Sequence, residues 1–151
     1  MKPPLRRLGV LVICLLVIIG GVAAFFMIQA QRLRQSGRQY VDVSIPAIMS
    51  TWDPDELDHR ASPELRLAMP RDEVTAMFAA LHERLGPMET YEGCDGEVTL
   101  SYTLDEGKAA RGTYEAAAKC AKGTLKIQVD LIYVNNNWLI RNLTFTSAAL
   151  Q

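Results

Sequence analysis

An unbroken apolar run dominates the beginning of the chain. Residues 8–28, LGVLVICLLVIIGGVAAFFMI, contain 21 positions without a charge or an amide. At about 1.5 Å per residue, a helix of this length matches the roughly 30 Å hydrocarbon core of a bilayer. A cleaved signal peptide has a shorter apolar region and small residues at the cleavage site. For a cut after Ala30, the position two residues earlier should be small, but this chain has Ile28 there. The pattern therefore predicts an uncleaved transmembrane helix over residues 8–28.

Basic residues flank this run on both sides: Lys2, Arg6, Arg7, Arg32, Arg34 and Arg38. A short tail ahead of a long downstream domain is typical of a signal anchor. We therefore expect residues 1–7 to form a cytoplasmic tail, and the domain to lie in the periplasm of a bacterium, held at the inner membrane. Residues 29–37 are rich in helix formers and predict a helical extension or linker that Ser36-Gly37 interrupts.

The apolar positions after residue 37 first follow helical spacing. Residues 38–52 predict a helix with a kink at Pro46. Asp53-Pro54 and Ser62-Pro63 each combine a capping residue with proline at the first helical position, which predicts two short helices. A third helix is expected from Pro70 until Gly86-Pro87 ends it.

From Met88 onward the period changes to two, which is typical of strands. Strands are expected over residues 98–104, 114–120, 125–133 and 138–145, with a loop over residues 105–112. Asn135-Asn136-Asn137 predicts a tight hairpin, because Asn tolerates the left-handed backbone. The last strand changes phase, so a bulge at Arg141-Asn142 is needed to keep one apolar face.

This order predicts an α+β domain over residues 38–151: about three helices packed on a curved antiparallel sheet of four or five strands. The layout is similar to cystatin-like and nuclear-transport-factor-2-like (NTF2-like) folds. The chain also resembles a group of uncharacterised bacterial membrane-anchored proteins over residues 38–148. The segments that carry this resemblance are caps, turns and core positions, namely Trp52-Asp53-Pro54, Ala61-Ser62-Pro63-Glu64-Leu65, Leu85-Gly86-Pro87 and Trp138-x-Ile140. They therefore indicate a fold more than a chemistry.

Charge is segregated along the chain, although the formal net charge is only −1. Residues 1–38 contain six basic residues and no acid, whereas residues 39–151 contain 10 basic and 17 acidic residues, which gives 10 − 17 = −7. The acidic domain argues against nucleic acid as a partner, because phosphate binding needs clustered Lys and Arg. The expected partners are the lipid bilayer, through residues 8–28, and a protein of the cell envelope or a second copy of the chain.

Cys94 and Cys120 fall in the predicted extracytoplasmic domain, in neighbouring strands. In an oxidising compartment such a pair predicts a structural disulfide, which would contribute about 3 kcal/mol on the chain-entropy model. Two separate buried thiols are the alternative, followed by redox or metal chemistry. No Cys-x-x-Cys motif is present, and neither His59 nor His82 has a metal-ligand spacing.

NTF2-like domains often enclose a conical pocket between the helices and the sheet. The side chains expected to line such a pocket are Tyr102, Tyr114, Tyr133 and Trp138, and their default role is apolar filling. No carboxylate is in phase with them, so we expect no catalytic residue, cofactor or metal site. Asp53, Asp55, Glu56 and Asp58 form an acidic cluster, in which Asp53 is better used as a helix cap.

The leading hypothesis is a non-enzymatic binding or assembly module on a single-pass anchor, with no biological process assigned. One alternative is a scaffold subunit of a conjugation-type secretion or envelope assembly complex. Another is a small-molecule-binding domain or enzyme that uses an NTF2-like cone. An open, polar space between the third helix and the sheet would favour a ligand, and a filled one would leave the outer face of the sheet as the expected contact surface.

Overall fold

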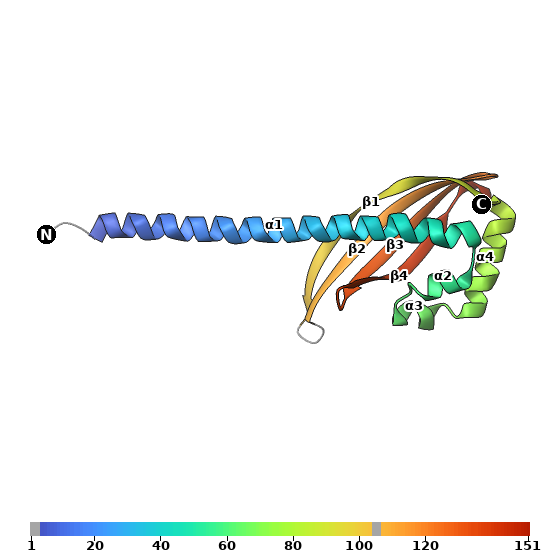
Figure 1. The fold of residues 1–151 in the computed structure, drawn as a ribbon, viewed down its shortest axis with the longest axis horizontal. Coiled ribbons are helices and arrows are strands. Elements are labelled where there is room, and N and C mark those ends of the chain that lie inside the picture. The colour runs from blue at the N-terminus through green and yellow to red at the C-terminus, as the bar shows by residue number, and fades with distance from the viewer. Residues whose placement is uncertain (1–3, 104–106) are drawn as a thin grey trace. The chain divides into compact units, whose positions relative to one another are not determined.

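The computed structural model describes residues 4–103 and 107–151. The chain divides into two compact units, residues 1–32 and residues 33–151. The elements run from helix α1 (Pro4–Thr51) to the short 3-10 helix η1 (Ala148–Leu150), and Figure 1 labels the helices α1–α4 and the strands β1–β4 among them. The large apolar side chains of the first unit, between Leu8 and Ile28, are exposed, and α1 is long and apolar enough to cross a membrane.

Helix α1 does not end at Ser36-Gly37, where the sequence predicts an interruption, and it also continues through Pro46. A glycine inside a helix costs about 1 kcal/mol relative to alanine. Within the second unit, however, Val41, Ile45 and Ile48 form a stripe of side chains that are at most 1% exposed. Burial of this stripe stabilises the helix by more than the local preference costs.

Three shorter helices follow, and their predicted caps are confirmed. They are α2 (Pro54–Asp58), α3 (Pro63–Ala68) and α4 (Arg71–Leu85). The Asp53 side chain accepts a hydrogen bond from the backbone N–H of Asp55, and Ser62 does the same for Leu65. Helix α4 ends at Gly86, whose φ of 72° is accessible to glycine at low cost.

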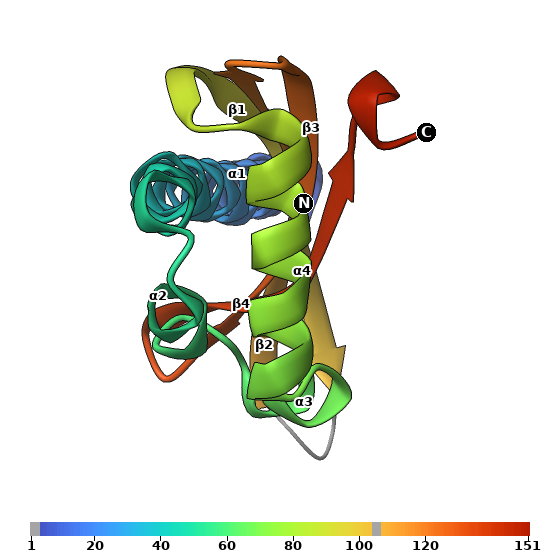
Figure 2. The same cartoon turned by 90° about the vertical axis from the view of Figure 1, so that its right-hand side faces the viewer.

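Four strands form one antiparallel sheet in the order β1-β2-β3-β4. Their bounds are β1 (Met88–Thr103), β2 (Gly107–Cys120), β3 (Gly123–Val134) and β4 (Asn137–Thr146). The curved sheet and the helices on one side of it confirm the predicted α+β class (Figure 1). Figure 2 shows α4 lying across that face beside the end of α1.

The strand ends agree with the sequence pattern at two places and differ at one. Asn135 and Asn136 take φ values of 50° and 64° in the hairpin, as predicted. Asp130 pairs with Asn142 and Leu131 with Ile140, so the extra residue Arg141 forms the predicted bulge. The predicted loop over residues 105–112 is too long, because β2 already begins at Gly107, opposite Thr103; residues 104–106 lie outside the described residues.

The core of the second unit fills the space between the helices and the sheet. The Trp52 and Phe78 rings meet edge to face, with centroids 5.6 Å apart, and Phe145 of β4 lies 6.4 Å from each of them. Leu125, Ile127, Val129 and Leu131 project from β3 into the same core and are at most 1% exposed. The strand residues between them, such as Lys126 and Gln128, are exposed, so the other face of the sheet is polar.

Three glycines surround the ring of Tyr114, which is 1% exposed. A Cβ atom built on Gly37 of α1 would clash with the Tyr114 hydroxyl, and one on Gly112 would lie 2.7 Å from the ring. A Cβ on Gly96, the cross-strand partner of Tyr114, would also lie 2.7 Å from it. The hydroxyl donates a 2.7 Å hydrogen bond to the Arg34 carbonyl. Because these three positions are glycines, α1 lies close enough to the sheet for the Tyr114 hydroxyl to reach the Arg34 carbonyl of the helix.

We expect Gly37→Ala to lower the free energy of unfolding by about 1–3 kcal/mol, because the added methyl overpacks against Tyr114. An exposed glycine in a helix would instead gain stability on this change. The loss should shrink in a Tyr114→Phe background, since the hydroxyl is the atom nearest to the new methyl. Urea denaturation of the four proteins in this cycle measures the coupling, and strict additivity would contradict the close contact.

Candidate functional site

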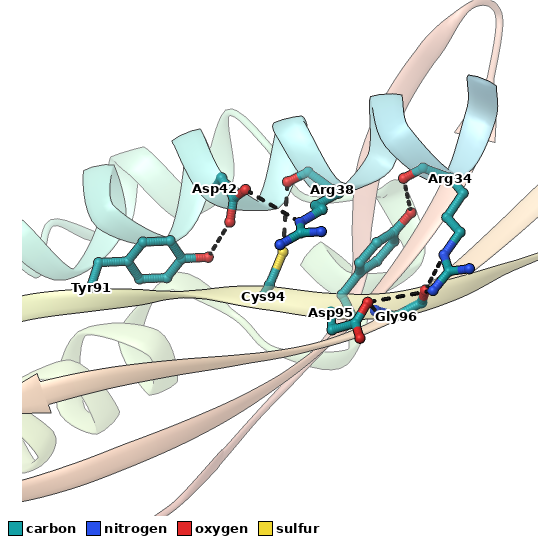
Figure 3. A network of polar contacts seen from close by, with 8 residues as sticks. Arg34, Arg38, Asp42, Tyr91, Cys94, Asp95 and Gly96 are labelled. Carbon is teal, nitrogen blue, oxygen red and sulfur yellow. Dashed lines mark hydrogen bonds and ion pairs between the residues drawn. The ribbon is translucent and has the colours of Figure 1, made fainter. Parts of the chain in front are cut away.

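Within the second unit, α1 is held to the sheet by a chain of polar contacts (Figure 3). The Tyr91 hydroxyl donates to the Asp42 carboxylate at 2.8 Å, and the Cys94 thiol donates to the Arg38 carbonyl at 3.7 Å. The bond from Tyr114 to Arg34 continues the row one turn earlier along the helix. Three sheet side chains thus contact successive turns of one helix face.

An open hollow of about 600 Å³, the charged groove, lies beside this row. Arg34 and Arg38 of α1 line it on one side, and the β1 segment 92–97 lines it on the other. Arg34 donates from Nε to the Gly96 carbonyl at 2.8 Å and contacts Asp95 at 3.5 Å. The charges of this groove are mixed and solvent-exposed, so each such pair contributes little to stability.

Burial raises the pKa of three side chains in this row, Cys94, Tyr91 and Tyr114, and so keeps them protonated. It raises the pKa of the Cys94 thiol to about 12, and the Asp42 carboxylate adds to the rise. Burial and the hydrogen bond to Asp42 raise the pKa of Tyr91 as well. Burial also raises the pKa of Tyr114 to about 12. A thiol with so high a pKa is a poor nucleophile at neutral pH, which indicates a packing role.

A second hollow, the aromatic groove, has a volume of about 490 Å³ and runs between α1 and the β3–β4 hairpin. Its α1 wall is the stripe Ser36, Gln39, Tyr40, Val43 and Ser44, and its hairpin wall is Tyr133, Asn136, Asn137 and Trp138. Arg60 completes the lining. The volume lies within the range typical of ligand sites, and aromatic rings with a few polar groups are typical linings.

Tyr102, Tyr114, Tyr133 and Trp138 were predicted to line one pocket, but Tyr114 lies apart from Tyr133 and Trp138. Tyr133 and Trp138 both line the aromatic groove, with ring centroids 4.9 Å apart. Tyr114 is buried under α1 and fills space there. The side chain of Tyr102 lies outside the described residues. Whether any of them binds a ligand stays a prediction.

Residues of α1 and Arg60 line the aromatic groove, and neither contribution was predicted from the sequence. A signal for the α1 residues exists, because Ser36, Tyr40 and Ser44 recur every four residues and so share one helix face. This periodicity continues across Ser36-Gly37, where we expected the helix to stop. Arg60 reaches the groove only through the tertiary fold, and no local pattern predicts its position.

The predicted Cys94–Cys120 disulfide is wrong, because both cysteines are free and buried. In the register of β1 and β2, Cys94 lies opposite Ala116 and Cys120 lies opposite Met88. The four residues from Ala116 to Cys120 span about 13 Å of strand. A disulfide needs Cα atoms within about 7 Å, so the two separate thiols of the alternative interpretation are what the structure contains.

Among the described residues, no three His, Cys, Asp or Glu side chains converge as a metal site would require. In the acidic cluster, Asp53 caps α2 and Asp55 is paired with Arg71. Glu56 is paired with Arg60 at 2.5 Å, and Asp58 with Arg66 at 3.4 Å. The carboxylates of this cluster therefore have structural partners. His82 lies 6.3 Å from the Trp52 ring, measured between ring centroids.

Comparisons with known proteins add little to these observations. No family model matches the sequence, and no curated protein matches it either. A solved designed protein, titled as a variant of Rd1NTF2_05, aligns with 14% sequence identity and a TM-score of 0.42 over 74% of this chain and 96% of its own. The class of the domain, a curved antiparallel meander with helices packed on one face, therefore rests on the strand order and helix positions described above.

The raised pKa values predict that the second unit loses stability in alkali. Cys94 keeps its proton when folded up to about pH 12, whereas the unfolded chain releases it near pH 9, so the free energy of unfolding should fall as pH rises through this window. Tyr91 and Tyr114 add to the fall above about pH 10. Urea denaturation from pH 7 to 11 measures the slope. Cys94→Ala should flatten it just above pH 9, and an unchanged slope would exclude this cause.

Proposed function

We propose that the protein is a single-pass, membrane-anchored binding or assembly module and that the aromatic groove is its contact surface. The observation that carries the proposal is the filled interior of the domain. Phe78 of α4 is 1% exposed and packs against Trp52 and Phe145. A ligand enclosed between α4 and the sheet would have to displace these rings, so a partner is bound at the surface. Aromatic side chains are enriched where protein surfaces make contact.

On this proposal the module acts by binding and carries out no catalytic step. The proposal is supported by the structural role of two ionisable side chains near the charged groove, which form hydrogen bonds to α1. Tyr91 and Cys94 are held protonated, and both are engaged with α1 through Asp42 and the Arg38 carbonyl. Both groups thus join the helix to the sheet. The aromatic groove, in contrast, has exposed amides at Gln39, Asn136 and Asn137 beside the half-buried rings of Tyr40 and Tyr133.

The proposed location is a bacterial inner membrane, with the N-terminus in the cytoplasm and the domain in the periplasm. The apolar, exposed segment of α1 supports the anchor. Basic residues lie on both sides of the span, so the proposed orientation rests on the shortness of the tail that precedes it and the length of the domain that follows it.

Reporter fusions in a bacterium test this orientation. Alkaline phosphatase needs an oxidising compartment to form its disulfides, so it should be active when fused after Gln151, while green fluorescent protein at the same position should stay dark. The same reporters fused ahead of Met1 should give the opposite result. Fluorescence together with inactive phosphatase at the C-terminal position would contradict a periplasmic domain.

Site-specific photo-crosslinking tests the contact surface. Val43 and Leu67 are exposed apolar residues, 67% and 85% exposed, and only Val43 lines the aromatic groove. A benzophenone amino acid at position 43 of the full chain in its native membrane should give discrete adducts, and the same residue at position 67 should give none. Adducts of equal yield at both positions, or at neither, would exclude the groove as the contact surface.

A further inference from the structure

The two edges of the sheet are covered to different extents. At the outer edge of β4, the Ile140 N–H donates to the Arg60 carbonyl at 2.7 Å, and the Ile140 carbonyl accepts from the Ser62 N–H at 2.8 Å. The segment between α2 and α3 therefore pairs with this edge, as the parallel bridge between Ala61 and Ile140 also shows. Strand β1 forms the opposite edge, and no strand lies beyond it in the described part of the chain.

Side chains cover the β1 edge at one position. The Gly96 carbonyl accepts from Arg34 Nε at 2.8 Å, and the Gly96 N–H donates to the Asp95 carboxylate at 2.9 Å (Figure 3). Before this point β1 is irregular, with two register shifts within residues 88–93. Bulges and charged side chains are devices that keep an edge strand from pairing with another chain. The first part of β1 is therefore protected.

Residues 97–103 of β1, which we call the open edge, lack these devices. They pair with β2 in continuous register, and the segment EVTLSYT contains no proline, no basic residue and one charge, at Glu97. The N–H and carbonyl of Gly96 point away from β2, so alternation along the strand directs those of Val98 and Leu100 the same way. Among the described residues, no backbone group pairs with them on that side. The open edge thus presents main-chain donors and acceptors at every second residue.

We propose that the open edge binds an extended segment of a partner protein, which adds a strand to the sheet beside β1. Main-chain N–H and carbonyl groups that recur with the period of a strand are matched by the backbone of another strand, and several peptide-binding domains use this mode. A sugar or a lipid does not present donors and acceptors in this repeat. The open edge is separate from the aromatic groove, so the inference does not depend on the proposed function.

The side chains of the open edge indicate the chemistry of the partner strand. Val98 and Leu100 are half-buried and pack against the core, whereas Glu97 and Thr99 are exposed. An added strand continues both faces of the sheet, so it should alternate apolar and polar residues. Glu97 forms no ion pair with a described side chain, and opposite charges on neighbouring strands attract. The polar residues of the partner strand are therefore expected to be basic.

A second copy of the chain is the competing occupant. Strand β1 contains four acidic residues, Glu89, Glu92, Asp95 and Glu97, and no basic residue. Pairing of two β1 edges would bring like charges onto adjacent strands, which is unfavourable. The charge of β1 therefore favours a different chain with basic residues.

Fluorescence anisotropy of labelled peptides, titrated with the full chain in detergent micelles, tests the inference. The probe is a peptide in which valine and lysine alternate. One control peptide alternates valine and glutamate, and a second has the composition of the probe with all valines grouped at one end. We expect saturable binding of the probe and binding weaker by about tenfold or more for both controls. Absence of probe binding, or equal binding of all three peptides, would overturn the inference.

A pair of variants tests whether the main chain of the open edge is bonded. Val98→Pro removes the N–H that the partner strand would bond, and Val98→Ala keeps it. Proline is tolerated there because that N–H points away from β2. We expect Val98→Pro to bind the probe about tenfold or more weakly than Val98→Ala, with thermal unfolding to verify that both are folded. Equal affinity of the two variants would contradict strand addition.

Hydrogen exchange at single-residue resolution supplies a measurement that needs no variant. In the free protein, the amides of Val98 and Leu100 should exchange faster than those of Glu97 and Thr99, which point towards β2. Saturation with the probe should slow exchange at Val98 and Leu100, and unchanged exchange at both would exclude binding at this edge. Slow exchange at both that develops with rising protein concentration, without peptide, would identify a second copy as the occupant in place of a partner strand. Crosslinks from position 43 test the aromatic groove independently of these results.

Discussion

Contact between Tyr114 and the helix turn that contains Gly37 determines how the second unit is assembled. The ring has space only because Gly37, Gly96 and Gly112 lack side chains around it. Its hydroxyl bonds the Arg34 carbonyl, and from this point α1 continues with Val41, Ile45 and Ile48 buried against the sheet. A larger residue at position 37 would move the helix away and open the core beneath it. The helix position in turn defines both grooves, since α1 forms one wall of each.

Much of the fold is visible in the sequence, because local chemistry decides many of its elements. Asp53 and Ser62 are caps whatever surrounds them, and alternation along residues 125–133 has one interpretation as a strand. The loss of phase at Arg141 identifies a bulge because only an extra residue restores a single apolar face. Gly37 is the opposite case. Its local signal predicts a helix end, and only a ring from a strand far along the chain explains why glycine is needed within a continuous helix.

The candidate site was harder to predict for the same reason. Tyr133 and Trp138 were expected to line one pocket together with Tyr102 and Tyr114, and of these four the aromatic groove contains Tyr133 and Trp138, which a hairpin joins. Tyr114 shares their strand pattern but lies under α1, since alternation fixes a face of the sheet without showing what covers it. Cys94 and Cys120 show why the strand register matters. Both face inward on adjacent strands, but Cys94 pairs with Ala116, which lies four residues before Cys120 in β2. The two flanks of α1 consequently differ in chemistry, with paired charges on one and aromatic and amide groups on the other.

The contacts that hold α1 to the sheet join residues far apart in the sequence. Cys94, Tyr114 and Trp138 contact helix residues that precede them by 56, 80 and 102 positions. During synthesis, the helix that forms part of the core is therefore made long before the strands that cover its apolar stripe. Such a topology has high contact order and forms slowly, with apolar surface exposed until the last hairpin is complete. The apolar stripe of α1 therefore stays uncovered until the strands have been translated, and a chain that ended before Trp138 would lack the contact between this residue and Ser36.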